Sequence, residues 1–522
     1  MRAIIGVGIG VIGGILLLLV ARRDSPGPGE AKKHPLSILV ILLTLAAFSI
    51  WCVIASVRFS VPFELEWCGG TMREMTQAVI NGRSLYPPVS SGWFPYEYPP
   101  LYFYISAAFS KIFHLEVYQA MRAVSITSTL GCCVVIFLWV VRLSRGFGAF
   151  WGAVAVGLLM ASYRMSGAWF DIERIDMLFL LLSLMGAFVL TPALENSESE
   201  GKRQFCTIMS AILFSLAFLT KQQAILFAVG AFVVLLTTNR HLLAAKYLAT
   251  FAFLSGSAVV IANQTTAGGF FYYCFKVPAG NGIQIALAKQ FFITDLPLIA
   301  PILFLGIISL PLLARVQGNQ ERSLQSFHFG TMLFMAAIGS LLSRAHWGGD
   351  QNVLIPLFTF AIIWGCTAAS SLEYRSRMFS LAVSLIIIGQ FGVFAYKPQA
   401  QLPIQNQSIA NESYAKAIKQ LETEGDVLCL DHGGITANPH FHILSLLDVY
   451  HAAKGIPVTI VDAIHSHKYA AIVVDSESGI SGLVPDISTY YPNKTKLGLT
   501  DSWTVTGYST PSADRPVWVY RP

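Results

Sequence analysis

The chain has 522 residues, of which 54% are hydrophobic and only 12% are charged. Charged residues make up about a quarter of an ordinary soluble domain, so this composition excludes a soluble globular protein. The formal net charge is +6, but Lys and Arg gather in short segments between apolar stretches, which argues against nucleic-acid binding and for a polytopic membrane protein.

Apolar stretches that approach the ~20 residues of a membrane-spanning helix recur from the N-terminus to residue 396 and then stop. We expect about twelve spans, at residues 3–21, 36–57, 123–143, 147–163, 177–194, 205–220, 224–238, 243–262, 295–314, 326–343, 353–370 and 378–396. Loops rich in Lys and Arg then all fall on one side, which predicts that this side is cytoplasmic and that both chain ends lie outside.

The longest predicted outer loop, residues 58–122, places Glu64 and Glu66 just before a glycine pair. In an extended segment this spacing puts both acids on one face. Such a carboxylate can act as a general base or hold a divalent cation such as Mg or Mn, although a merely solvated loop is the alternative. An aromatic stretch beginning at Tyr98 is short for a span and predicts a helix along the outer interface, and Arg122 lies where the next span begins.

The next outer segment and the turn at Lys221 carry further charges. Charged groups this close to hydrocarbon cost a few kcal/mol and persist when they are paired or functional. Asp171, Arg174 and Asp176 form either an ion-pair cluster that ties the loop to a helix or a substrate site. Lys221 lies on the outer side against the usual charge bias, and a lipid phosphate is the obvious partner for it.

A third polar segment, RAHWGGDQN, contributes Arg344, Asp350 and Asn352 to the same predicted face. It is interpreted either as a polar turn or as part of a substrate site. The eight cysteines show no metal-ligand spacing, and the His-x-His pairs of the C-terminal part lack a supporting pattern, so zinc is not favoured.

Residues 397–522 alternate short apolar strands with a helical stretch. Strands are predicted at 426–430, 470–475 and 516–520, and a helix at 442–455, closed by a glycine. The predicted fold is therefore a polytopic α-helical membrane domain over residues 1–396, followed by a small extracytoplasmic α/β or α+β domain over 397–522.

Several phrases, taken in order, resemble the GT-C class of integral-membrane glycosyltransferases, in particular the RgtA/B/C/D-like branch related to protein O-mannosyltransferases and aminoarabinose transferases. They are FELEWCGG, NGRSLYPP, YEYPPLYFYISAAFSKIF, MRAVSI, WFDIERIDMLFL, FLTKQQAIL and GGDQNVLIPL, between about residues 60 and 360. The resemblance implies a catalytic carboxylate in the first outer loop, interfacial helices packed beneath it and a second acidic site in the next outer loop. It also implies transfer of a sugar, with inversion, from a polyprenyl-phosphate donor to a glycan, lipid or protein acceptor at the outer face of the plasma membrane or bacterial inner membrane.

The chain departs from the family pattern at two positions. Where some relatives have an acid beside the glycines, this chain has Gly69 preceded by Cys68, and Tyr98 stands where some relatives have Lys. We therefore expect Glu66 to be the base, with Glu64 second and Asp171 as the alternative. Phosphate or substrate contacts are expected from the remaining candidates, namely Lys221, Arg174, Asp176, Arg344, Asp350, Asn352, Tyr98 and Arg122.

A polytopic transporter or flippase of envelope precursors is the competing interpretation, since about twelve spans are typical of transporters. Transporters, however, commonly bind substrate near the bilayer midplane between repeated halves. No matching halves are visible in this sequence, and its charges gather at one interface.

Overall fold

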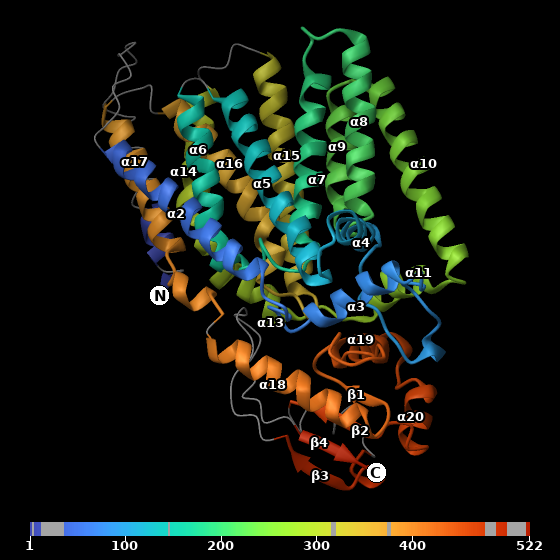
Figure 1. Cartoon of the computed structure of the whole chain (residues 1–522). Coiled ribbons are helices and arrows are strands. Elements are labelled where there is room, and N and C mark those ends of the chain that lie inside the picture. The colour runs from blue at the N-terminus through green and yellow to red at the C-terminus, as the bar shows by residue number, and fades with distance from the viewer. Residues whose placement is uncertain are drawn as a thin grey trace.

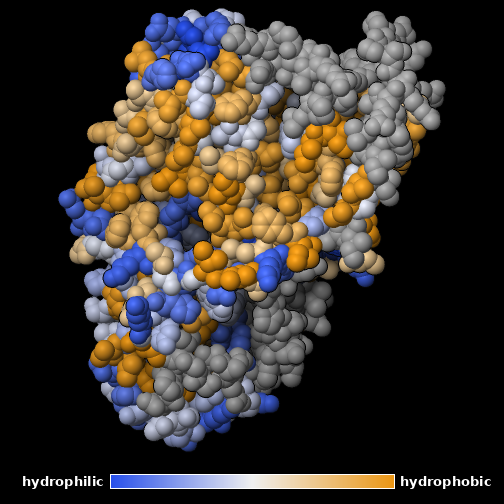
Figure 2. Space-filling view, turned by 180° about the vertical axis from the view of Figure 1, so that it is seen from behind, coloured by the Kyte–Doolittle hydropathy of each residue, from blue (hydrophilic) through white to orange (hydrophobic). Residues whose placement is uncertain are grey.

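The structure, a computed structural model, describes residues 1–2, 5–11, 36–144, 147–314, 320–372, 377–403, 405–475, 487–497 and 518–522. A bundle of long, roughly parallel helices forms the larger part, and the C-terminal region, residues 397–522, lies against one end of it (Figure 1). Hydrophobic residues cover the broad middle of the molecule, whereas hydrophilic residues gather at its two ends (Figure 2). This distribution is that of a multi-pass membrane protein.

The bundle helices coincide with eleven of the predicted spans. They are α2 (Leu36–Phe59), α5 (Val117–Leu143), α6 (Gly148–Ala161), α7 (Asp176–Leu190), α8 (Glu200–Phe218), α9 (Ala224–Thr237), α10 (His241–Thr265), α14 (Ala300–Ala314), α15 (Gln320–Ala345), α16 (Ile355–Leu372) and α17 (Arg377–Phe394). Seven helical stretches of the described chain are long and apolar enough to cross a membrane. The first predicted span lies mostly outside the described residues, so the count of twelve stays a prediction.

The predicted first outer loop contains two helices at the end of the bundle that faces the C-terminal region. These are α3 (Gly69–Ile80) and α4 (Leu101–Phe113). Helix α4 lies across the upright bundle helices, as expected for the aromatic stretch (Figure 1). It buries Tyr102 and Phe103 and leaves Ile112 and Phe113 exposed, which suits a helix at a membrane interface. Short helices α11 (Gly269–Phe271), α12 (Val277–Gly280) and α13 (Ile285–Gln290) lie at the same end.

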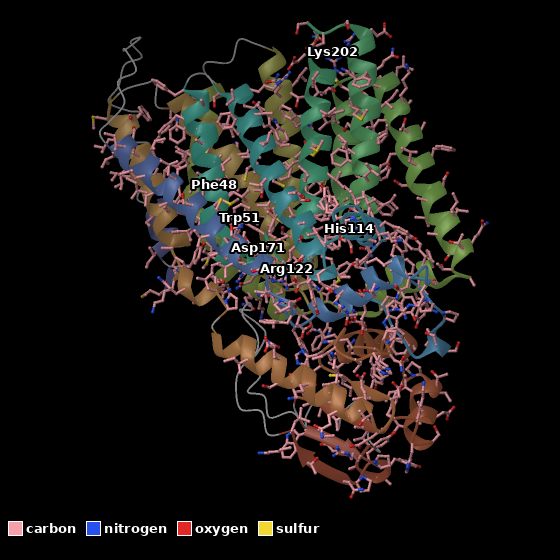
Figure 3. All side chains as sticks on the ribbon, viewed as in Figure 1. Phe48, Trp51, His114, Arg122, Asp171 and Lys202 are labelled. Carbon is pink, nitrogen blue, oxygen red and sulfur yellow. The ribbon has the colours of Figure 1, made fainter. Side chains whose placement is uncertain are left out.

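The charged residues sort to the two ends of the bundle. Lys202 lies at one end, and Arg122 and Asp171 lie near the other, beside the C-terminal region (Figure 3). At the Lys202 end, Arg142 forms an ion pair with Glu195. The loops predicted to be cytoplasmic and the acidic loops predicted to be outside are therefore segregated in space.

Within its described residues, the C-terminal region combines a four-stranded sheet with four α-helices. The sheet has the order β1-β2-β4-β3, in which β1 and β2 are parallel and the other pairs antiparallel. Its strands are β1 (Val427–Cys429), β2 (Ala471–Val474), β3 (Asn493–Lys496) and β4 (Trp518–Arg521), and its helices are α18 (Gln405–Glu422), α19 (Ile443–Ala453), α20 (Val458–His465) and α22 (Ile487–Tyr490). The predicted strands and helix are present. Lys454, rather than the predicted glycine at 455, adopts the left-handed conformation that ends α19.

Candidate active site

A cavity of about 590 Å³ lies between the end of the helix bundle and the C-terminal region. Four of the residues predicted from the sequence line it, namely Tyr98, Arg174, Lys221 and Asn352. Other lining residues come from the loops before α4 and α7, from the end of α12, and from α9, α15 and α19. They include Glu97, Trp169, Asn281, Leu342, Leu444 and Asp448. The cavity is therefore built by segments far apart in the sequence.

Arg122 fixes the path of the loop that enters the site. It is fully buried, and its Nε donates a 2.7 Å hydrogen bond to Glu173. Its other guanidinium N–H groups donate to the carbonyl oxygens of Arg58, in the last turn of α2, and of Val61 and Phe63 in the loop that follows. Glu173 in turn accepts from the backbone N–H of Leu65 at 2.8 Å. Arg122 therefore holds the segment that carries the two candidate bases, and it lies outside the cavity lining.

The side chain of Glu64 is buried, and both of its carboxylate oxygens form hydrogen bonds within the protein. Its Oε2 accepts from the backbone N–H of Gly70 at 2.7 Å, and its Oε1 is hydrogen-bonded to Nδ1 of His432. The other ring nitrogen of His432 lies 2.7 Å from a carboxylate oxygen of Asp475. Glu64 thus ties the start of α3 to the C-terminal region, and both of its oxygens are engaged in doing so.

Glu66 faces the guanidinium of Arg174, with 3.6 Å between Oε2 and Nη1. Burial raises the pKa of Glu66 to about 6, and the opposing charge of Arg174 limits the rise. Arg174 lines the cavity and lies over the ring of Trp169, with 4.3 Å from its guanidinium carbon to the ring centroid. Glu66 therefore lies beside the cavity, behind the lining residue Arg174.

Asp171 is bound to Tyr163 and Arg58, away from the cavity. Its carboxylate accepts a 2.7 Å hydrogen bond from Tyr163 and forms a 3.3 Å ion pair with Arg58, and both charged side chains are completely buried. Arg58 also donates to the carbonyl oxygen of Ala168 at 3.2 Å. The structure therefore places Asp171 in a pair that joins α2 to the loop before α7, outside the cavity lining.

Asp176, Lys221 and Asn352 are brought together at the cavity wall. Lys221 Nζ lies 2.8 Å from Asp176 Oδ1, and the Asn352 side-chain amide donates to the same oxygen at 3.0 Å. Lys221 belongs to the turn between α8 and α9, at the bundle end that faces the C-terminal region, and its predicted place on the outer side stays a prediction. Asp176 holds the ammonium group in place while Lys221 remains part of the lining.

Arg344 and Asp350 lie in the neighbouring turn and are bound to the protein. Arg344 Nε is 2.8 Å from Asp295, and the Asp350 side chain accepts from the backbone N–H of Gln351 at 2.7 Å. Neither is part of the lining, whereas Gly348 and Gly349 between them are. The RAHWGGDQN segment therefore lines the cavity with His346, Trp347, the glycine pair and Asn352, while Arg344 and Asp350 hold the turn in place.

Tyr98 completes an aromatic wall near the charged groups. The guanidinium carbon of Arg174 lies 5.7 Å from the Tyr98 ring centroid, within the range of a cation–π contact. Among the described residues, no group of three or more His, Cys, Asp or Glu side chains is placed to hold a metal ion. Glu66 faces a guanidinium rather than a second carboxylate. The divalent cation suggested by the sequence therefore stays a prediction.

Comparisons with known proteins agree with this architecture. The family model described as dolichyl-phosphate-mannose-protein mannosyltransferase matches residues 97–263. The structure is similar to that of ArnT from Cupriavidus metallidurans bound to undecaprenyl phosphate, with a TM-score of 0.57 and 13% identity over 92% of this chain and 97% of that one. The chain has the GT-C fold of membrane glycosyltransferases.

A second GT-C structure gives the same result. The Archaeoglobus fulgidus oligosaccharyltransferase, tethered with an acceptor peptide, matches with a TM-score of 0.52 and 13% identity over 89% of this chain and 74% of that one. A comparison with curated proteins found no match. At these identities the likeness shows the fold, and the residues of this chain have to carry the chemistry.

Several residues of the candidate site were not predicted from the sequence. Glu173 lies in the recognised phrase WFDIERIDMLFL, but nothing in the spacing shows that it pairs with Arg122. His432 and Asp475 lie in the C-terminal region and reach the first loop only through the fold. The HGG phrase at 432–434 was the available signal, since two adjacent glycines permit close approach of another backbone.

Proposed function

We propose that this chain is a glycosyltransferase that moves a sugar from a polyprenyl-phosphate-linked donor to an acceptor hydroxyl group, with inversion. The observation that carries the proposal is the cavity itself, where Arg174 and Lys221 lie in one wall and the carboxylate of Glu66 contacts Arg174 from behind. Cations for a phosphate leaving group and a base for an attacking hydroxyl are the two requirements of this reaction.

Glu66 is the general base in this proposal. The acceptor oxygen attacks the anomeric carbon, its proton passes to Glu66, and the bond from that carbon to the phosphate oxygen breaks, leaving its electron pair on the phosphate. A pKa of about 6 leaves Glu66 ionised at neutral pH and makes it a stronger base than an ordinary carboxylate. Glu64 is less suited to this role because Gly70 and His432 already engage its oxygens.

Arg174 and Lys221 stabilise the negative charge that remains on the departing phosphate. The Nε and Nη1 atoms of Arg174 are buried and make no hydrogen bond among the described residues, so the guanidinium retains donors for a ligand. Lys221 is held by Asp176 at the same wall. Charge-assisted bonds of this kind are among the stronger interactions available to a phosphate.

The apolar side of the cavity suits a lipid-linked donor. Ile225 on α9 and Leu342 on α15 both line it, and they are 46% and 54% exposed. A prenyl chain can lie along these residues in the bilayer while the phosphate reaches Arg174. In this proposal the end of the bundle that carries the cavity, together with the C-terminal region, faces the outer side of the inner or plasma membrane, and the charge bias of the loops supports that orientation.

Mass spectrometry of envelope glycans, lipids and proteins tests the proposal. Cells lacking the gene are complemented with the wild-type chain, with Glu66→Gln or with Glu64→Gln, at matched membrane abundance. We expect one hexose- or pentose-sized mass increment that requires the wild-type chain and falls 10²- to 10⁴-fold with Glu66→Gln, the usual contribution of a general base. Identical envelopes with and without the gene would contradict the proposal.

A further inference from the structure

Helix α19 of the C-terminal region forms one wall of the cavity. Leu444 and Asp448 belong to the lining, opposite residues of the helix bundle. The helix is seated closely on α12, because a Cβ added at Gly280 would come within 2.8 Å of the Cα atom of Ala452. The position of Asp448 is therefore fixed by backbone packing.

Asp448 shares a polar partner with Glu97, which comes from the loop before α4. The side-chain amide of Asn281 donates to Asp448 at 2.9 Å and to Glu97 at 3.4 Å, and its oxygen lies 3.0 Å from Nδ1 of His451. Burial raises the pKa of Glu97 well above its usual range, and the neighbouring Asp448 raises it further. Burial also raises the pKa of Asp448, to about 6, while Asn281 and His346 oppose the rise.

Because their pKa values are raised, the carboxyl groups of Glu97 and Asp448 can share a proton and so offer a hydrogen-bond donor and acceptors side by side. The raised pKa of Glu97 favours its protonated form, which donates a hydrogen bond, while the remaining carboxyl oxygens of the pair accept. Adjacent hydroxyl groups of a sugar ring match this arrangement, since each hydroxyl can donate to one group and accept from the other. A hydrocarbon chain would leave both carboxyl groups buried without this compensation.

Tryptophans of the same cavity point to a ligand independently of the acids. Trp169 is only 4% exposed and lines the cavity, yet its Nε1 has no hydrogen-bond partner among the described residues. Trp347 also lines the cavity and is 43% exposed. A buried donor of this kind is normally satisfied, so a bound group is the natural partner for Trp169. An exposed indole offers a flat apolar face of the sort that covers the C–H side of a sugar ring.

We propose that Glu97, Asp448 and Asn281 form an acceptor subsite that binds the hydroxyl groups of a carbohydrate, so that the C-terminal region selects a glycan as the acceptor. This inference rests on the proposed transferase function and names the class of its acceptor. Asp448 contacts the substrate in this proposal, whereas His451 positions Asn281.

The test uses the full-length chain in cells that lack the gene, complemented with Asp448→Ala, Asp448→Asn or Trp347→Ala. Asp462→Asn is the matched control, because Asp462 is exposed on α20 of the same region and is not part of the lining. Membrane abundance and thermal unfolding of the purified chains are measured alongside. The readout is the amount of transferred sugar found on glycan, lipid and protein fractions.

We expect the sugar on a glycan, with transfer reduced at least tenfold by Asp448→Ala and by Trp347→Ala. Asp448→Asn should be affected less, because an amide retains hydrogen-bonding capacity, and Asp462→Asn should equal the wild type. Transfer to a protein, or to a lipid without a sugar at the attachment point, would overturn the inference and leave the transferase function intact. Wild-type transfer by Asp448→Ala would overturn it as well, whereas a wild-type envelope identical to that of cells lacking the gene would count against the transferase itself.

Discussion

Glu64 and His432 are 368 residues apart in the sequence and share a buried hydrogen bond. Their contact lies at a junction where the glycine pair of the first loop meets the HGG turn of the C-terminal region. A Cβ added at Gly70 would come within 2.0 Å of the carbonyl oxygen of Gly433. Gly434 adds a further bond, since its backbone N–H donates to Glu74 at 2.8 Å. We call this set of contacts the loop junction.

Replacing His432 by alanine should release the loop junction. The change leaves Glu64 and Asp475 buried without a shared donor, and removing one partner of a buried charged network commonly costs about 3–5 kcal/mol. We expect at least tenfold faster protease cleavage near residues 397–405, together with reduced sugar transfer. Glu64→Gln combined with His432→Ala should be little worse than His432→Ala alone, because both changes remove the same bond. Additive effects in this pair would contradict a shared role.

Gly70→Ala tests the backbone contact of the loop junction without altering any charge. The added methyl group cannot be accommodated against the Gly433 carbonyl, so the C-terminal region should move away from the first loop. We expect a loss of activity similar to that of His432→Ala. Gly455→Ala is the matched control, because nothing lies within 4 Å of a Cβ at that position. Normal activity of Gly70→Ala would show that the contact is dispensable.

The pH dependence of transfer should report on Glu66. A general base acts in its ionised form, so the rate should fall about tenfold for each pH unit below about 6, the pKa of this buried group. Above that value the rate should become level. An initial-rate profile from pH 5 to 8 measures this, with chain integrity checked after each incubation. A profile that stays level down to pH 5 would exclude Glu66 as the base.

Asp171→Asn separates a structural role from a catalytic one. The substitution leaves Arg58 charged and buried without its counterion, which should destabilise the chain by about 3–5 kcal/mol. Glu66→Gln should lower activity without a comparable loss, so thermal unfolding of the two purified variants compares them directly. Full stability combined with loss of transfer in Asp171→Asn would instead restore Asp171 as a candidate base.

Arg174→Lys should weaken the stabilisation of the leaving phosphate. A lysine cannot reproduce the planar contact with Trp169 or the spread of guanidinium donors, so we expect kcat to fall roughly 10²-fold, a typical loss for one oxyanion donor. Lys221→Ala should behave similarly. Lys276→Ala is the control, since that lysine is exposed. Steady-state kinetics with varied donor measures all three, and an unchanged kcat in Arg174→Lys would argue against phosphate contact.

Much of the membrane part could be predicted from the sequence because its signals are local. Apolar runs and charge bias gave the helix positions, and the proline pair with its aromatic stretch predicted α4, which lies across the bundle. The chemical character of the loops was equally visible, and Tyr98, Arg174, Lys221 and Asn352 all line one cavity.

The pairing of the charges was beyond sequence reasoning, because it depends on contacts between distant segments. Spacing could not show that Asp171 faces Arg58 while Glu66 faces Arg174, although Asp171 and Arg174 are only three residues apart. The sequence also could not show that α19 lines the cavity, because Asp448 occupies a polar position of the kind found on any amphipathic helix.

The loop junction also bears on the biogenesis of the protein. A segment near residue 64 is complete only when residues 432 and 475 have been synthesised and have reached the same side of the membrane. In a nascent chain whose membrane helices have already been inserted, the first loop would not yet be fixed in position by these contacts. The first loop can therefore take its final position only after residue 475 has been synthesised, so the order of synthesis sets when the loop junction closes.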